Sequence, residues 1–328
     1  MKTNILLYPF NELLIKETVY GMLIVKGTGF SVGIESEQSF LNNLFRSLNN
    51  LFPKRYIPEY TVSTSSGEEG IDALVSWISG EGFSVQKHVL RDNGIDEYFI
   101  RSSLPEPYVN ESPYFFLLQV IARSIVKNDY LVLTDSISFV VNNKTYLLIG
   151  YPHTGKSTLL ALALMNDAIP LSTENTVVSV SRDGVRIVGG TSVLVYDPRI
   201  EDIYNVKLEY DSMTRHGYRI VDLEKHYPMR NNYYGEVVDA IYVLHSSFKS
   251  VGVDAEPVKG RKILKTLWYF ASALLRGLDY YPPYPLVLST RIIDNKVENM
   301  LRLVSEKYSG RFYEVYGRHD YIFKYIVD

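Results

Sequence analysis

Apolar and polar positions in the first hundred residues form runs that predict alternating strands and helices. Apolar runs at Tyr20–Lys26 and Phe30–Ile34 flank Gly27-Thr28-Gly29, a pattern typical of a β-hairpin. From Phe40 to Leu51 the apolar residues recur at helical spacing, and Pro53 is expected to end that helix. We expect further strands at Ile5–Tyr8, Tyr60–Thr64, Phe83–Leu90 and Glu97–Arg101, and a second helix at Glu68–Ile78.

The stretch Ser102–Pro113, which contains three prolines, predicts a boundary between two parts of the chain. Ser112 followed by Pro113 is typical of a helix start, with a capping hydroxyl and then a residue that has no N–H to satisfy. We therefore expect a small α+β module at residues 1–110 and a second domain at residues 111–328, which together make an α/β protein. The helix from Ser112 is expected to continue through Ile125.

The second domain is predicted to be rich in short strands. Asp197–Tyr234 is polar, aromatic and poorly periodic, so we expect it to be mainly loops. Helices are expected at Arg261–Arg276 and Lys296–Ser305. The predicted strands are Tyr130–Thr134, Ile137–Val141, Tyr146–Ile149, Thr176–Val180, Val185–Val188, Ser192–Val195, Val237–Leu244, Leu286–Leu288 and Phe312–Tyr316.

One segment of this domain carries a specific chemical signal. Residues 150–157, GYPHTGKS, match the pattern G-x-x-x-x-G-K-[ST] of the P-loop. An apolar run, Tyr146–Ile149, precedes the motif, and a run rich in Leu and Ala, Thr158–Met165, follows it. Strand, glycine loop and helix in this order place backbone N–H groups and a helix N-terminus around phosphate oxygens. The predicted phosphate-binding residues are Gly150, Tyr151, Pro152, His153, Thr154, Gly155, Lys156, Ser157 and Thr158.

The motif predicts binding of Mg-ATP or a related nucleoside triphosphate. Lys156 would place its charge on the β and γ phosphates, and Ser157 would offer its hydroxyl to Mg²⁺. An acid is also needed near the metal and the attacking group, and Glu174, at a turn before a predicted strand, is the nearest downstream candidate. His153 is expected to face solvent or the nucleotide base.

Around this motif the chain resembles the HPr kinase/PEP carboxykinase-like branch of P-loop proteins, and in particular HPr-kinase-related proteins of unknown substrate. The resemblance covers about residues 112–244. It implies a P-loop domain with a mixed sheet and a phosphotransferase activity. Asp135-Ser136 stands where that family has a histidine, and Thr173-Glu174 stands where it has a pair of acids.

The resemblance suggests site residues beyond the motif. Asp135 would accept the proton of an attacking hydroxyl, and Glu174 would orient the metal. Arg230, in a segment similar to the family's P-V-R loop, is the first choice among Arg215, Arg219 and Arg230 for a clamp on the γ phosphate.

Three functions stay open at this stage. The first is an ATP-dependent kinase that acts on a hydroxyl-bearing small molecule or protein. The second is a nucleotide-dependent NTPase or switch, and the third is a non-catalytic nucleotide-binding assembly protein.

Composition and charge argue against several classes of protein and of site. A net charge of −3 argues against a general nucleic-acid binder, and the lack of cysteine excludes disulfides and thiolate metal sites. No apolar run is long enough for a membrane span, and the N-terminus lacks the apolar core of a signal peptide. We expect a cytoplasmic protein without membrane partners. A homo-oligomer stays open.

Overall fold

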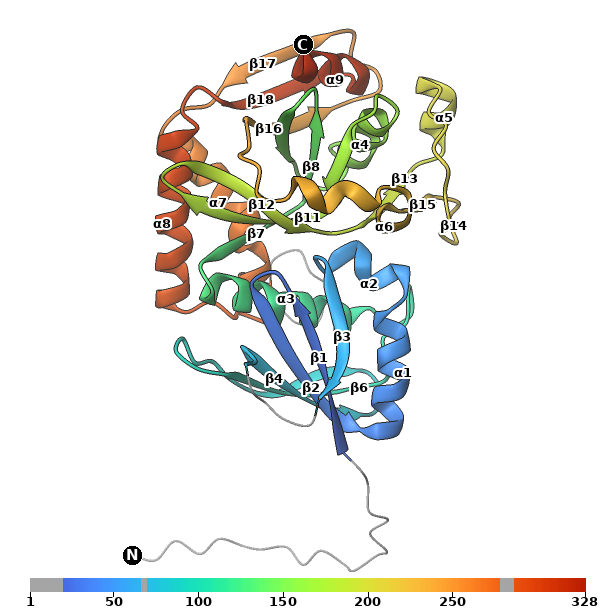
Figure 1. The fold of residues 1–328 in the computed structure, drawn as a ribbon, viewed down its shortest axis with the longest axis vertical. Helices are drawn as coiled ribbons and strands as arrows, with labels where there is room; N and C mark the ends of the chain where they lie inside the picture. The colour runs from blue at the N-terminus through green and yellow to red at the C-terminus, as the bar shows by residue number, and fades with distance from the viewer. Residues whose placement is uncertain (1–19, 66–69, 278–285) are drawn as a thin grey trace, which may run out of the picture.

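The computed structural model describes residues 20–65, 70–277 and 286–328, and the predicted strand Ile5–Tyr8 lies outside them. These residues form a mixed α/β structure with two six-stranded sheets and two three-stranded sheets (Figure 1). Figure 1 shows the first sheet in the lower part of the molecule and the second in the upper part.

The first sheet has the strand order β3-β1-β2-β4-β6-β5. The predicted hairpin is present, because β1 pairs with β2 in antiparallel register across Gly27↔Phe30. Helix α1 buries Phe40, Leu41, Leu44 and Leu48 against the molecule, as its helical spacing requires. The elements are β1 (Tyr20–Gly27), β2 (Phe30–Glu37), α1 (Gln38–Leu48), α2 (Leu51–Tyr56), β3 (Tyr60–Ser65), β4 (Ala73–Ser79), β5 (Phe83–Val89) and β6 (Asp96–Ser102).

Two predictions for this region are wrong. The expected helix at Glu68–Ile78 is instead strand β4 from Ala73 onward, in which Ala73, Val75 and Trp77 are buried and alternate with less buried neighbours. That period of two is the signature of a strand. Pro53 also does not end α1, which stops at Leu48; it lies in the first turn of α2, where its missing N–H has no helical partner to lose.

The second sheet has the order β10-β8-β9-β16-β18-β17. Strands β9, β16 and β18 are parallel neighbours, whereas β10, β8 and β17 pair antiparallel. Asn142 and Asn143 both have positive φ angles, as a tight hairpin between β8 and β9 requires. The strands are β8 (Ser136–Val141), β9 (Lys144–Ile149), β10 (Ile169–Ser172), β16 (Ala240–Ser246), β17 (Val253–Pro257) and β18 (Phe312–Gly317).

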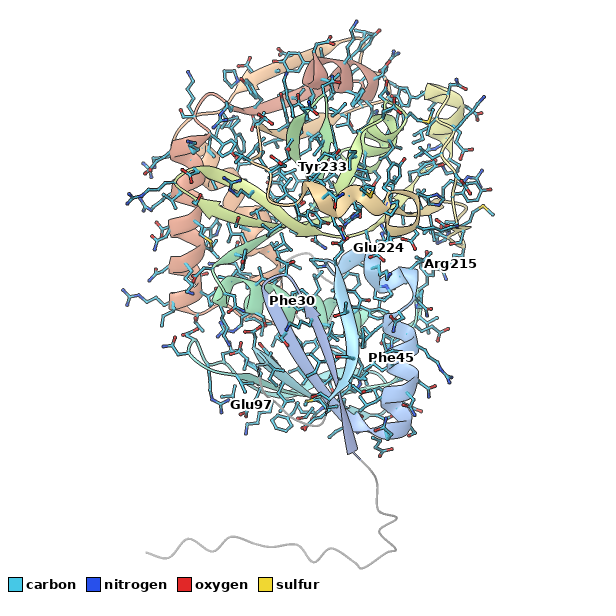
Figure 2. All side chains as sticks on the ribbon, in the orientation of Figure 1. Phe30, Phe45, Glu97, Arg215, Glu224 and Tyr233 are labelled. Carbon is cyan, nitrogen blue, oxygen red and sulfur yellow. The ribbon has the colours of Figure 1, made fainter. Side chains whose placement is uncertain are left out.

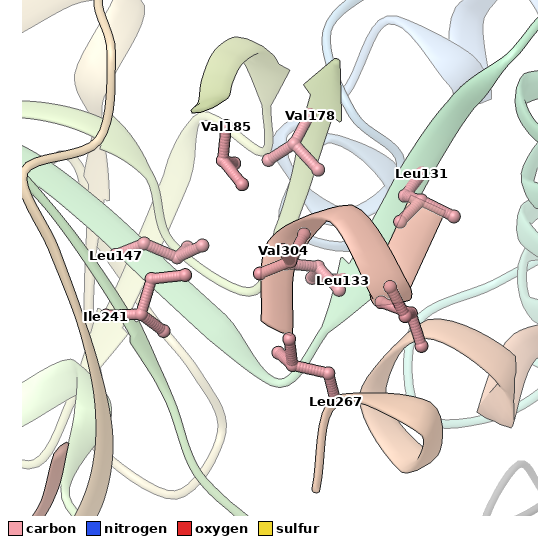
Figure 3. A pocket seen from close by; sticks show the side chains of 9 residues that line it. Leu131, Leu133, Leu147, Val178, Val185, Ile241, Leu267 and Val304 are labelled. Atoms are coloured by element: carbon pink, nitrogen blue, oxygen red, sulfur yellow. The ribbon is translucent and has the colours of Figure 1, made fainter. Parts of the chain in front are cut away.

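Helices cover both faces of the second sheet, which explains the continuous apolar run of β9. Leu148 of β9 lies in one core cluster with α4 (Lys156–Leu164) and α9 (His319–Val327). Leu147 and Ile149 lie in the other cluster with α7 (Arg261–Arg276) and α8 (Arg291–Lys307). A void of about 10 Å³ remains in that second cluster, between β9, β16 and the helices (Figure 3).

Two small sheets and helix α3 complete the structure. Helix α3 (Ser112–Lys127) buries side chains in the same cluster as both large sheets, so the predicted division at residue 110 stays a prediction. Its first helical residue is Ser112, and Glu111 precedes it without a side-chain cap, contrary to the predicted serine cap. The sheets are β12-β11-β7 and β13-β15-β14, made of β7 (Tyr130–Thr134), β11 (Asn175–Ser181), β12 (Gly184–Gly190), β13 (Val193–Tyr196), β14 (Ser212–Met213) and β15 (Arg219–Asp222).

Other differences from prediction are local. The segment Asp197–Tyr234 is not only loops, because β15 pairs along its length with β13. Leu286–Leu288 is irregular and not a strand. The sequence reading missed β10, β17 and α9. The remaining short elements are α5 (Arg199–Tyr204), α6 (Leu223–His226) and the 3-10 helix η1 (Pro228–Tyr233).

Candidate functional site

The glycine loop lies between a buried strand and a helix. Strand β9 is buried from Thr145 to Ile149, and α4 begins at Lys156, so the predicted strand–loop–helix arrangement is present. Within the loop, His153 and Gly155 have positive φ angles of 67° and 88°. A Cβ at Gly155 would collide with the side chains of Ser246 and His319, so glycine is needed there for space as well as for conformation.

The first turn of α4 presents free backbone donors. The N–H groups of Lys156, Ser157 and Thr158 donate to no backbone acceptor among the described residues, as expected for the start of a helix. Together with the helix dipole, such donors attract an anion. A lone helix N-terminus would be weak evidence, but here a lysine, a hydroxyl and a tight glycine turn surround the same point.

Lys156 is held in place by three acceptors. Its side chain is 7% exposed, and Nζ donates to the Gly150 carbonyl at 2.6 Å, to the Tyr151 carbonyl at 3.0 Å and to Asp135 Oδ1 at 3.0 Å. The ammonium therefore lies over the loop itself, where it adds positive charge to the backbone donors.

The loop faces a cleft of about 600 Å³, a volume in the range of ligand pockets. Pro152, His153, Gly155, Lys156, Ser157 and Thr158 line it. Gly150, Tyr151 and Thr154 do not line it. Tyr151 instead packs its ring on Phe270 of α7 at 5.3 Å, and Thr154 donates its hydroxyl to the Tyr151 carbonyl.

The two predicted acids meet at this cleft. Asp135 lies between β7 and β8, Glu174 lies between β10 and β11, and both line the cavity. A backbone hydrogen bond from Ser136 to the Glu174 carbonyl, 2.9 Å long, joins the two connections. Both acids therefore lie at the cleft beside the loop, whereas their chemical roles stay predictions.

The two acids differ in their surroundings. Burial raises the pKa of the Glu174 carboxyl, and the positive charges of Arg55 and Lys156 offset only part of that effect. Asp135 is the partner of the Lys156 ammonium. Thr173, which stands where the resembled family has the first acid of its pair, is buried and donates its hydroxyl to the Val193 carbonyl. Glu174 is thus the member of that pair that faces the cleft.

Arg230 is not part of this cleft, contrary to prediction. Its side chain is 1% exposed, and it forms an ion pair with Glu59 at 2.6 Å and a hydrogen bond with the Tyr234 hydroxyl at 2.6 Å. It belongs to the contact between the first sheet and η1. The P-V-R similarity that suggested it was three residues long, too short to fix a position in space.

Arg55 lines the cleft in its place, from helix α2 near the first sheet. The Asn175 side chain donates to the Tyr56 carbonyl at 2.6 Å and so joins the two segments that carry Glu174 and Arg55. Both side chains line the cleft, and the charge of Arg55 acts on the Glu174 carboxyl. Among the described residues Arg55 forms no ion pair, and it contacts the Tyr56 ring at 4.9 Å. No sequence motif marks Arg55, since its position depends on how α2 packs on β13.

A chain of three hydrogen-bonded polar side chains supports the loop. His319, the first residue of α9, bonds through Nε2 to Ser246 Oγ at 2.8 Å and through Nδ1 to Tyr204 Oη at 3.0 Å. Ser246 in turn donates to the Thr154 carbonyl in the loop. All three groups are satisfied if Tyr204 donates to Nδ1, Nε2–H donates to Ser246, and Ser246 donates to Thr154. This arrangement requires a neutral histidine.

Acid is expected to break this support. Burial lowers the pKa of His319 from 6.5 to about 4, so between those values the unfolded chain takes up a proton that the folded protein refuses. Stability should fall by about 3 kcal/mol as the pH drops from 6.5 to 4 because of this residue alone. Unfolding curves of wild type and His319→Gln across this range measure it. The difference in stability between the two should shrink as the pH falls; equal pH slopes would contradict it.

Among the described residues, no group of three or more histidines or carboxylates is arranged to hold a metal ion. A magnesium ion that accompanies a nucleotide does not need one, because it binds one or two protein groups, phosphate oxygens and water. The Ser157 hydroxyl with one carboxylate in the same cleft fits that donor set.

Comparisons with known proteins add no constraint. No protein-family model matches the chain, and no curated protein matches its sequence. The HPr-kinase-like resemblance therefore rests on the residues already described and stays a prediction. Among the described residues, no helix is both long enough and apolar enough to cross a membrane.

Proposed function

We propose that the protein is a P-loop phosphotransferase that transfers the γ phosphate of Mg-ATP to a hydroxyl-bearing substrate. The observation that carries this proposal is the glycine loop with Lys156, which opens on a cleft that Asp135, Glu174 and Arg55 also line. Among the described residues, Arg55 forms no ion pair that would hold it away from a phosphate. A nucleotide-binding loop alone would serve many functions, but phosphoryl transfer needs donors for the phosphates together with an acid beside them.

The positive groups of the cleft would bind different phosphates of the nucleotide. Backbone N–H groups at the start of α4 and the Lys156 ammonium would bind the β and γ phosphates. Arg55, which lines the same cleft, would contact the transferred phosphate, the role we first expected of Arg230. Magnesium, which would be held by Ser157 and one cleft carboxylate, neutralises phosphate charge when bound.

The geometry exchanges the roles that the sequence suggested for the two acids. Asp135 is bound to Lys156, so we assign it to orienting that ammonium over the loop. Glu174 is the better proton acceptor, because its raised pKa brings it nearer the pKa of a useful general base. In the reaction the substrate oxygen bonds to the γ phosphorus, the bond to the bridging oxygen breaks, ADP leaves and Glu174 takes the hydroxyl proton.

Replacement of Glu174 by glutamine tests this assignment. Formation of ADP from Mg-ATP, with water or an alcohol as acceptor, should fall by about a hundredfold or more, while nucleotide affinity stays near the wild-type value. The wild-type rate should increase with pH through a pKa above 4.5, since only the carboxylate accepts a proton, and the variant should lose that dependence.

The exposed Glu236→Gln serves as the matched control and should change neither quantity. Wild-type turnover in Glu174→Gln would remove the acid from the mechanism. Nucleotide binding without any turnover in wild type would favour the assembly protein, and hydrolysis without transfer to any alcohol would favour the NTPase or switch.

A further inference from the structure

A side pocket opens from the cleft on the side of helix α2. Its volume is about 150 Å³, and its walls are mainly apolar. Most of its surface is formed by Leu51 and Phe52 of α2, Pro107 between β6 and α3, Val193 of β13 and Ile220 of β15. A cavity of this size and lining accommodates one ring-sized apolar group.

The side pocket and the cleft share one wall. Arg55, Tyr108, Val195 and Thr214 line both, so a molecule can extend from one into the other. None of the loop residues from Gly150 to Ser157, all of them described, lines the side pocket. The shared wall includes Arg55, whose charge acts on the Glu174 carboxyl in the cleft.

Contacts with neighbouring elements hold two walls of the side pocket in place. Lys54 of α2 forms a 2.5 Å ion pair with Glu224, which Figure 2 shows just above α2. The backbone carbonyl of Lys54 accepts a hydrogen bond from the N–H of Ser192. On the outer side, Arg215, also labelled in Figure 2, lies 5.1 Å from the centre of the Tyr108 ring. These contacts join α2 to Glu224 of α6 and to Ser192 beside β13, and preformed walls are usual in binding sites for small molecules.

We propose that this side pocket binds the apolar part of the phosphoryl acceptor, which makes the substrate a small alcohol that carries one ring-sized apolar group. The inference rests on the proposed function. The group in the pocket would hold the molecule so that its hydroxyl enters the cleft beside Glu174 and next to the transferred phosphate. The hydroxyl oxygen then takes the phosphate, its proton passes to Glu174 and ADP leaves.

The nucleotide would occupy the other end of the cleft. Phe248, Ser246 and His319 line that end and not the side pocket. The base and the alcohol would then occupy separate sites, so the protein would bind both at the same time. The experiment can measure this simultaneous binding.

Ligand-detected NMR with 2-phenylethanol as the probe tests the proposal on the full chain. Saturation transfer to the ring protons should be seen with wild type and should persist when Mg-ATP is added. Ile220→Phe, which fills the side pocket without touching the cleft, should weaken the probe about tenfold or more. Glycerol, which has hydroxyls but no apolar group, should give no transfer.

Two further variants keep the result interpretable. Ile203→Phe, at an exposed position, is the control and should bind the probe like wild type. Phe52→Ala enlarges the pocket and should change the affinity for the probe. It gives a second test if Ile220→Phe folds poorly. Displacement of the probe by Mg-ATP would overturn the proposal, because the base would then occupy the pocket. So would equal binding by wild type and both pocket variants, or no binding at all.

Thermal shift with Mg-ATP, measured on the same samples, separates this inference from the proposed function. Probe binding without any nucleotide shift would leave the side pocket as a binding site and remove the phosphotransferase. A nucleotide shift without probe binding would leave the proposed function standing and remove the side pocket as a binding site.

Discussion

Replacement of Lys156 by alanine is expected to remove turnover of Mg-ATP and to weaken its binding strongly. The ammonium lies directly over the glycine loop, bound to the carbonyls of Gly150 and Tyr151 and to Asp135, so it can bind a phosphate there by exchanging one of these acceptors. Removal of one such preorganised donor lowers turnover by about a hundredfold or more. ADP formation and the thermal shift caused by Mg-ATP measure the two effects.

Two controls show whether the loss is specific. Lys144→Ala removes an exposed lysine at the other end of β9 and should leave binding and turnover unchanged. Lys156→Ala also leaves Asp135 without its ion pair, so the double variant Lys156→Ala/Asp135→Asn should recover stability without recovering activity. The same nucleotide-induced shift in wild type and Lys156→Ala would show that the loop does not bind phosphates.

The largest effect on stability is expected from Arg123 in α3. Its side chain is fully buried, and Nε donates to Asp96 at 2.8 Å, Nη2 to Asp92 at 3.0 Å and Nη1 to the Leu288 carbonyl at 2.9 Å. These contacts join the first sheet to the segment that precedes α8. Arg123→Leu should lower the free energy of unfolding by about 3–5 kcal/mol, because Asp96 is then a buried charge with too few partners. Urea unfolding measures it.

Arg302 offers a matched comparison. It forms an exposed ion pair with Glu298 one helical turn away, and Arg302→Leu should cost about 0.5 kcal/mol or less. The double variant Arg123→Leu/Asp96→Leu should be more stable than Arg123→Leu, since it removes the unpaired charge as well. Similar losses for Arg123→Leu and Arg302→Leu would show that the buried network contributes little.

The sequence predicted the parts of the site that depend on local order. The glycine loop, the buried strand before it and the helix after it are all encoded within about twenty consecutive residues, and the structure has each of them. Asp135 and Glu174 also line the cleft, as expected of Glu174 from its place downstream of the motif and of Asp135 from the resemblance.

What the sequence could not predict depends on contacts between distant segments. Arg55 enters the cleft because α2 packs on β13, and the His319–Ser246 support joins two elements 73 residues apart. Arg230 was misplaced for the same reason, since its partner is Glu59 in another part of the chain. The prediction of a helix at Glu68–Ile78 was wrong for a different reason. A short apolar run is compatible with the period of a helix and with that of a strand. The alternating burial of Ala73, Val75 and Trp77 shows that this segment is a strand.

The central claim is that the loop from Gly150 to Ser157 binds the phosphates of a nucleoside triphosphate. A crystal structure of the protein with magnesium and a non-hydrolysable ATP analogue tests it most directly. We expect phosphate density at the N-terminus of α4, in contact with Lys156 and with the backbone N–H groups of the loop. Density for the analogue at any other place, with the loop free of phosphate, would contradict it.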